Sequence, residues 1–382
     1  MDKTPISFPT SGLSHPKSFF PALRQFIRRP SIRGPLLSAL QTLAAILIAV
    51  LAGGLLLILV GVDPFTAYGA LVKGAFGTWP AFARTLRTTS PVLFTGLAVV
   101  VAFRAGYIYL GMEGSLYWGA LASALFGIYL STYFPVFLQM PLSILAGCLA
   151  GGLWALFPAV LRARWKVDEV VSTLMLNYVA ILLVDHLVYT YFQDPRDGSS
   201  AERALTLPVP TTARLPFLSE PYGLTIAIVL GVLLALLLVW VYARSVWGFE
   251  ADMTGFNRKF AHYGGVNTVR MAIMSMVLSG VIAGLGGATE SIGSYGRYIG
   301  GFSSDFGFSG VTVALMGRLS PIGTLFGALF FGALTNGGAS MELAVSVPRD
   351  IVVVIQGLIL LLVTAQSLFS LLRLGSKARP EE

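Results

Sequence analysis

Residues 245–270, SVWGFEADMTGFNRKFAHYGGVNTVR, form a polar insert between two long apolar runs. The run before the insert covers residues 222–243, and the run after it covers residues 269–290. Each is close to the ~20 apolar residues that a helix needs to cross the hydrocarbon core of a bilayer. Apolar runs of this length, alternating with short polar segments, predict a chain that crosses a membrane several times and keeps this insert outside the lipid.

The composition of the whole chain gives the same prediction. Of 382 residues, 55% are hydrophobic and only 12% are charged, whereas soluble domains carry about 25% charged residues. The net charge of +8 comes from basic residues beside the apolar runs, so it predicts membrane orientation and excludes nucleic acid as a partner. The single cysteine, Cys148, lies inside an apolar run and excludes a disulfide framework or a cysteine metal site.

The apolar runs predict an all-α, polytopic transmembrane helical bundle with about ten crossings, some of them short or broken. Lys and Arg cluster in 1–35, 162–166, 244–270 and the tail, which places all four segments and both termini in the cytoplasm. The predicted organisation is a basic cytoplasmic segment 1–35, a transmembrane domain 36–372 with a cytoplasmic segment 244–268, and a cytoplasmic tail 373–382. The expected spans are 36–60, 90–104, 114–134, 141–161, 169–192, 222–243, 269–290, a hairpin of two short segments at 308–318 and 321–335, and 350–372.

The sequence lacks the motifs of the common catalytic and metal sites. It contains no G-x-x-x-x-G-K-[ST], H-E-x-x-H or G-x-S-x-G pattern, and its three histidines lie far apart. We therefore expect no catalytic residues, no metal and no cofactor, which disfavours a membrane enzyme. Few carboxylates lie within the apolar runs, whereas ion-coupled carriers need such groups. A neutral polar cargo driven by an external energy source is expected, and a stand-alone secondary carrier is the alternative.

Two polar residues in or beside the spans are candidates for a transport path. Glu113 starts a helix in LGMEGS, where the helix dipole favours a carboxylate, so it either caps a broken helix or faces the path. Asn177 lies in the middle of an apolar helix and needs a partner within the membrane. It either joins two helices or faces the path of an uncharged polar solute.

The polar insert predicts an amphipathic helix from about Asp252 to Tyr263, ended by Gly264-Gly265. Met253, Phe256, Phe260 and Tyr263 fall on one stripe of that helix. Such a helix either lies flat on lipid or docks into a soluble cytoplasmic partner. Docking is the preferred interpretation, because the chain has no ATP-binding motif of its own.

Four stretches carry a family resemblance: RAGYIYLGMEGSLYWGA (104–120), VDEVVSTLMLNYVA (167–180), GFEADMTGFNRKFAHYGGV (248–266) and FGFSGVTVALMGRLSPIGTLFGALFFGAL (306–334). In this order, they resemble the permease subunits of bacterial ABC importers of the ribose/nucleoside type, and more closely the nucleoside-uptake branch. The resemblance covers residues 40–372. The residues that match the family's motifs include Arg104, Gly106, Gly111, Glu113, Gly114, Glu169, Thr173, Asn177, Tyr178, Gly248, Gly255, Asn257, Tyr263, Gly265, Gly310, Gly317 and Pro321.

The resemblance implies a multi-pass permease subunit in the bacterial cytoplasmic membrane, surrounded by membrane lipid. Its partners would be an ABC ATPase subunit that uses the ATP, a second permease subunit, homologous or identical, and an extracytoplasmic substrate-binding lipoprotein. The cargo would be a nucleoside, with a pentose or other simple sugar as the alternative. The resemblance places Met253, Phe256, Asn257, Phe260 and Tyr263 in the segment that couples to the ATPase.

The substrate path would contain Glu113, Asn177, Tyr178 and Phe306. Phe306, with Phe308, stands at the expected outer mouth, where it either stacks on a nucleobase or anchors the chain at the membrane interface.

The chain departs from the family pattern at four positions. Tyr109 stands where the family has Asn, and Ser115 where it has Gln, so polar contacts at these positions are expected to change. In the coupling segment, Asp252 replaces a basic residue and Arg258 a common proline. These two changes predict an altered charge pattern and a partner ATPase with complementary changes.

Overall fold

The computed structural model describes residues 48, 51–59, 61–195, 203–345, 351–354, 357–358 and 361. The expected segments 1–35 and 373–382 lie outside these residues, as do most of the expected spans 36–60 and 350–372. The α-helices are α3 (Pro64–Phe76), α4 (Trp79–Arg104), α5 (Met112–Leu125), α6 (Val136–Trp165), α7 (Glu169–Leu187), α8 (Ala227–Arg244), α9 (Val246–Phe256), α10 (Arg258–Tyr263), α11 (Thr268–Thr289), α12 (Phe306–Met316) and α13 (Pro321–Val345).

Six helical segments in the described part of the chain are long and apolar enough to cross a membrane. They are Trp79–Arg104, Val136–Trp165, Glu169–Phe192, Ala227–Arg244, Thr268–Ser294 and Pro321–Val345; a seventh arises if Leu51–Leu59 and Pro64–Phe76, bent by 120°, form one span. The helical, multi-pass architecture predicted from the apolar runs is thus confirmed. The ten crossings and the cytoplasmic position of the termini remain predictions.

The region 306–345 differs from the expected hairpin of two short segments. Its first helix, α12, is short, with 11 residues, as predicted. The second, α13, has 25 residues and continues ten residues past the predicted end at 335, so the prediction of a short second segment was wrong. The polar TNGGAS stretch continues the helix because Asn336 donates from its side-chain nitrogen to the backbone oxygens of Gly74 and Ala81, at 2.8 and 3.0 Å.

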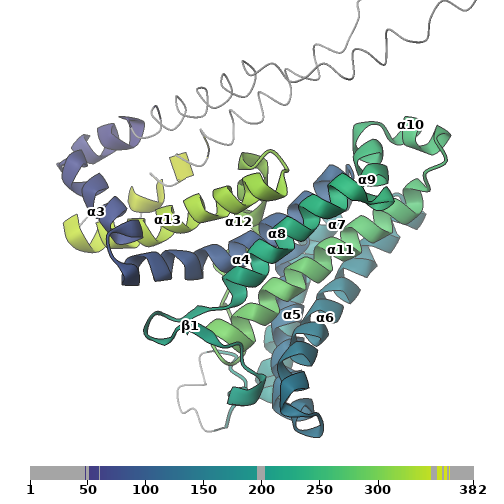
Figure 1. The fold of residues 1–382 in the computed structure, drawn as a ribbon, viewed down its shortest axis with the longest axis horizontal. Helices are drawn as coiled ribbons and strands as arrows, with labels where there is room; N and C mark the ends of the chain where they lie inside the picture. Colours follow the sequence, from purple (N-terminus) through teal and green to yellow (C-terminus); the bar gives the residue numbers. More distant parts are fainter. Residues whose placement is uncertain are drawn as a thin grey trace, which may run out of the picture.

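The helices form two groups, which Figure 1 shows side by side. One is a bundle of α5, α6, α7, α8 and α11; the other contains α3, α12, α13 and the start of α4. Helix α4 joins them and is buried almost continuously from Thr89 to Ala102. Helix α11 packs against α4, α5 and α6, and small residues allow this close approach, since a Cβ added at Gly284 would meet the backbone of Gly147 and Gly151.

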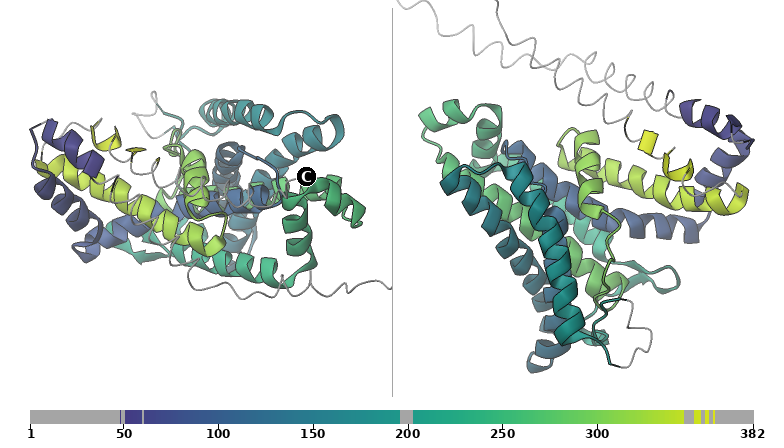
Figure 2. Two further views of the ribbon diagram at one scale, coloured as in Figure 1. Left: turned by 90° about the horizontal axis from the view of Figure 1, so that it is seen from above. Right: turned by 180° about the vertical axis from the view of Figure 1, so that it is seen from behind.

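Helices α9 and α10 lie at one end of the bundle and project away from α3 and α13, as the views in Figure 2 show. At the other end the spans finish in π-helical turns, η1 (Phe126–Leu130), η3 (Val188–Phe192) and η6 (Glu290–Ser294). That end also carries three 3-10 turns, η2 (Ser131–Tyr133), η4 (Thr211–Ala213) and η5 (Glu220–Tyr222), and an antiparallel pair, β1 (Phe217–Ser219) with β2 (Leu224–Thr225).

Candidate functional site: the α9–α10 segment and its anchors

The polar insert forms two helices, and the prediction of a single helix from Asp252 to Tyr263 was wrong. Helix α9 ends at Phe256, and Asn257 adopts an extended conformation with φ −156° and ψ 105°. The Asn257 side-chain oxygen accepts hydrogen bonds from the backbone N–H groups of Lys259 and Phe260, at 3.0 and 3.1 Å. The insert therefore breaks at this residue, because asparagine caps a new helix better than it continues an old one.

The aromatic residues predicted for docking lie at the projecting end of this segment. Phe256, Phe260 and Tyr263 have exposed fractions of 96%, 61% and 88%, whereas Met253 is partly buried. Three exposed aromatic rings on two short helices form an apolar surface of the kind that protein partners cover. Their role in docking remains a prediction.

The backbone of α9 lies directly against the loop between α4 and α5. A Cβ added at Gly255 would lie closer than 3.0 Å to the carbonyl oxygen of Arg104, a separation that real Cβ atoms essentially never show. It would also lie 3.3 Å from the backbone nitrogen of Gly106. Gly106 itself has φ +79°, a conformation that glycine adopts without strain. The two glycines thus allow contact between the two backbones.

An ion pair reinforces this contact. The Nε of Arg104 donates to Oδ1 of Asp252 at 2.8 Å, and its Nη2 lies 2.5 Å from Oδ2. The same guanidinium lies over the ring of Tyr242, 3.9 Å from its centroid. Bidentate arginine–carboxylate pairs of this kind are strong and directional, so α9 is fixed to the end of α4. Asp252 therefore has a partner within the chain, and the complementary change expected in a partner ATPase stays a prediction.

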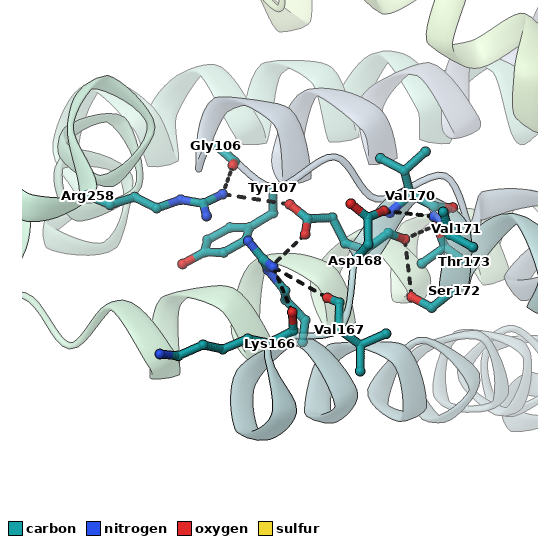
Figure 3. Close-up of polar contacts among 12 residues, drawn as sticks. Gly106, Tyr107, Lys166, Val167, Asp168, Val170, Val171, Ser172, Thr173 and Arg258 are labelled. Carbon is teal, nitrogen blue, oxygen red and sulfur yellow. Dashed lines mark hydrogen bonds and ion pairs between the residues drawn. The ribbon is translucent and has the colours of Figure 1, made fainter.

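Arg258, the second departure from the family pattern, also finds its partners within the chain (Figure 3). Its Nη2 donates to the carbonyl oxygen of Gly106, and its guanidinium lies 4.3 Å from the centre of the Tyr107 ring. The same nitrogen lies 3.8 Å from Oε1 of Glu169. Arg162 binds the other oxygen of Glu169 at 2.8 Å. Glu169 is therefore shared by one arginine from α6 and one from α10.

The contacts of Arg104, Asp252, Arg258, Glu169 and Tyr107 form a junction between the α9–α10 segment and the ends of α4, α6 and α7. Tyr107 also contacts the start of α11. Its hydroxyl donates to the backbone oxygen of Thr268 at 2.8 Å. Burial raises the pKa of Tyr107, while the nearby charge of Arg258 partly opposes that rise. The hydroxyl thus stays protonated and remains a donor. Beside it lies a cavity of about 250 Å³, lined by Tyr107, Arg162, Ala163, Lys166, Arg258, Thr268, Val269 and Ala272.

The residues predicted for the substrate path are not all in one place. Asn177 is buried and uses both ends of its amide: Oδ1 accepts from the N–H of Gly114 at 2.9 Å, and Nδ2 donates to the carbonyl of Leu110 at 2.7 Å. Asn177 therefore joins α7 to the start of α5, which was one of the two roles expected for it. The next residue, Tyr178, has a side chain that is 63% exposed, so it does not share the buried position of Asn177.

Glu113 is buried at the start of α5, and its Oε2 accepts a hydrogen bond from the backbone N–H of Gly307 at 2.6 Å. It thus caps α12, a helix far away in the sequence, as well as lying in the first turn of its own helix. Phe306 is partly buried beside it, and its carbonyl accepts from Thr95 at 2.8 Å. The structure therefore brings Glu113, Asn177 and Phe306 together at the beginning of α5.

The other two departures from the family pattern are bonded to each other. The hydroxyls of Tyr109 and Ser115 lie 2.8 Å apart, and the tyrosine hydroxyl also donates to the carbonyl of Gly111 at 3.0 Å. In the described residues no group of three or more His, Cys, Asp or Glu side chains could hold a metal. The position of Glu169 directly after the basic stretch 162–166 predicts a pairing with those bases, which the Arg162–Glu169 ion pair confirms. Arg104 was not assigned to the junction from the sequence, although it lies at the end of an expected span.

The fold and the junction define a multi-pass, helical membrane protein with a projecting helical segment anchored to its long helices. The chain belongs to the family described as "Branched-chain amino acid transport system / permease component", whose model matches residues 81–364. Proteins of this family are permease components and not themselves enzymes.

Curated relatives cover most of the chain. It is 32% identical over 335 residues to the guanosine ABC transporter permease protein NupP of Bacillus subtilis, which covers 85% of this chain and 93% of the relative. It is 33% identical to the glucose ABC transporter permease protein TsgB13 of Haloferax volcanii, over 86% of this chain and 88% of the relative. It is 29% identical to the nucleoside ABC transporter permease protein NupB of Lactococcus lactis, over 89% of this chain and 94% of the relative. No solved structure matches.

Proposed function

We propose that the protein is the permease subunit of an ATP-driven importer in the bacterial cytoplasmic membrane and that its cargo is a nucleoside. Two relatives that cover most of the chain are named for guanosine or nucleoside transport. A nucleoside is neutral and polar, which agrees with the chain's low content of charged residues, 12%. The relative named for glucose, at 33% identity, supports a simple sugar as the second candidate.

The observation that carries the ATP-driven part of the proposal is the α9–α10 segment. It presents Phe256, Phe260 and Tyr263 to the outside and is fixed by Asp252 to the end of α4. A separate ATP-hydrolysing subunit docked on these rings would push the segment when it closes on ATP. The push would reach the spans through Arg104 and the α4–α5 loop, and the spans would then alternate their access.

In this proposal, the α9–α10 end faces the cytoplasm, and the opposite end, with its π-helical turns, receives substrate from an extracytoplasmic binding lipoprotein. A second permease subunit completes the membrane core. The chain contributes no cofactor. Tyr178 and Phe306, together with Glu113 and Asn177, remain our candidates for the path. Tyr178 would reach a path shared with the second subunit, because it is exposed on this one.

Uptake by proteoliposomes tests the proposal. The chain is reconstituted with its ATPase, second permease and binding lipoprotein, and uptake of labelled guanosine, uridine, ribose and glucose is measured with ATP or a non-hydrolysable analogue inside. ATP-dependent uptake of a nucleoside, unaffected by ionophores, is the expected result. Uptake of glucose or ribose alone would support the sugar importer, and uptake that ionophores abolish would support a secondary carrier.

A further inference from the structure

The contacts at the junction divide it into two parts. The first part contains the α9–α10 segment, residues 246–263, and the start of the α4–α5 loop, residues 105–107, with Arg104 before it. The end of the loop is held to α7, since the N–H and the carbonyl of Leu110 are hydrogen-bonded to Thr173 and Asn177, at 3.2 and 2.7 Å. The second part is the α6–α7 corner, residues 162–169. We infer that the first part moves as one unit during transport and separates from the α6–α7 corner at the contact between Arg258 and Glu169. This inference rests on the proposed ATP-driven function.

Four contacts hold the first part together. Arg104 and Asp252 form the bidentate pair, at 2.8 and 2.5 Å. The backbone of Gly255 lies against the carbonyl of Arg104. Arg258 donates to the carbonyl of Gly106 and covers the ring of Tyr107. Backbone packing, hydrogen bonds and an ion pair thus connect the same two segments, so a displacement of α9 and α10 must displace the first residues of the α4–α5 loop.

The boundary with the α6–α7 corner is held differently. Among the described residues one ion pair crosses it, between Arg258 and Glu169, at 3.8 Å. This distance is longer than a hydrogen bond, and the Arg258 side chain is 40% exposed. Glu169 keeps Arg162 at 2.8 Å through its other oxygen. Arg258 can therefore leave Glu169 while the buried carboxylate keeps Arg162 as its partner, which avoids the penalty of an unpaired buried charge.

The cavity of about 250 Å³ lies along this boundary. Tyr107 and Arg258 line it from the first part, and Arg162 and Lys166 line it from the corner. Cations therefore face each other across the cavity, with Glu169 between two of them. Once Arg258 has left Glu169, its repulsion by Arg162 and Lys166 favours the separated state. The boundary thus contains a cavity, a weak ion pair and several positive charges.

Reversible crosslinking distinguishes the two contacts, and the single cysteine makes it simple. On a Cys148→Ser background, one variant carries Arg104→Cys with Asp252→Cys, and the other carries Glu169→Cys with Arg258→Cys. Each is reconstituted in the full complex and treated with a short bifunctional thiosulfonate. We expect the 169–258 crosslink to lower ATP-dependent uptake at least tenfold, relative to the same variant before crosslinking, and reduction to restore it. The 104–252 crosslink replaces the ion pair by a covalent link between the same two helices, so it should change the uptake of its own uncrosslinked variant less than twofold.

The opposite pattern, or full uptake with the 169–258 crosslink formed, would overturn the inference. A second pair across the cavity, Lys166→Cys with Arg258→Cys, keeps Glu169 intact and gives the same test if the first double variant folds poorly. Copurification of the ATPase is measured in parallel. If the ATPase binds and the uncrosslinked proteins transport, failure of the crosslinking pattern refutes the moving unit alone; if native protein shows no ATP-dependent uptake, the proposed function fails instead.

Discussion

Replacing Gly255 by alanine is expected to destabilise the protein and to lower ATP-dependent uptake, because it disturbs the contact between α9 and the end of α4. In a helix, alanine is favoured over glycine by about 1 kcal/mol, so without a steric conflict the change would stabilise α9. The added Cβ, however, would meet the carbonyl oxygen of Arg104 closer than 3.0 Å. That neighbour is backbone and cannot rotate away, so the cost falls in the upper part of the ~1–3 kcal/mol typical of overpacking. The net expectation is a loss of about 1–2 kcal/mol.

Gly264→Ala is the matched control. Gly264 lies at the end of α10 with φ −75°, and a Cβ there would meet its nearest neighbours at 3.4 and 3.5 Å, which is ordinary contact. Thermal unfolding of the purified full-length proteins in detergent measures stability, and ATP-dependent uptake measures coupling. Gly255→Ala should lower both, and Gly264→Ala neither. A Gly255→Ala protein as stable and as active as the control would refute the backbone contact on which the junction is built.

Three further changes test individual contacts. Asn177→Ala leaves two buried backbone groups without partners and should cost about 1–3 kcal/mol of stability, measured by thermal unfolding; a cost no larger than that of Tyr178→Ala would count against the helix joint. Glu113→Gln keeps an oxygen that can accept from the N–H of Gly307, so it should retain much more uptake than Glu113→Ala; equal losses would show that the carboxylate charge matters instead. Asn257→Ala should loosen α10 by about 1 kcal/mol and raise amide hydrogen exchange there, while Asn257→Ser should preserve the cap; unchanged exchange in the alanine protein would contradict the capped break.

The parts of the fold that depend on local sequence were predictable. Long apolar runs predicted the membrane helices, because period and length alone identify them. The break at Asn257 was missed because the aromatic stripe matched one continuous helix, although asparagine before a charged turn is itself a helix-start signal. The length of α13 was missed because Asn336 finds its partners on α3 and α4, which no local pattern reveals.

The candidate site also contains a part that local sequence predicts and a part that it does not. The aromatic residues in the insert could be identified from their spacing. The anchors could not, because Arg104 and Asp252 lie 148 residues apart and Glu113 lies 194 residues from Gly307. Asp252 and Arg258 illustrate the difference: comparison with the family pattern identified them as departures, but only the structure shows that they pair with Arg104 and Glu169. Contacts between distant segments become visible only when the helices are packed.

In the proposed function, the exposed end of α9 and α10 binds the ATP-hydrolysing subunit. Copurification of that subunit with the tagged native chain and with a Phe256→Glu, Phe260→Glu variant is the decisive test. Trp165→Glu, at an exposed aromatic on the α6–α7 corner, serves as the control. Native and control proteins should retain the ATPase, and the double variant should lose it. Equal retention by all three would show that the ATPase does not bind at these rings.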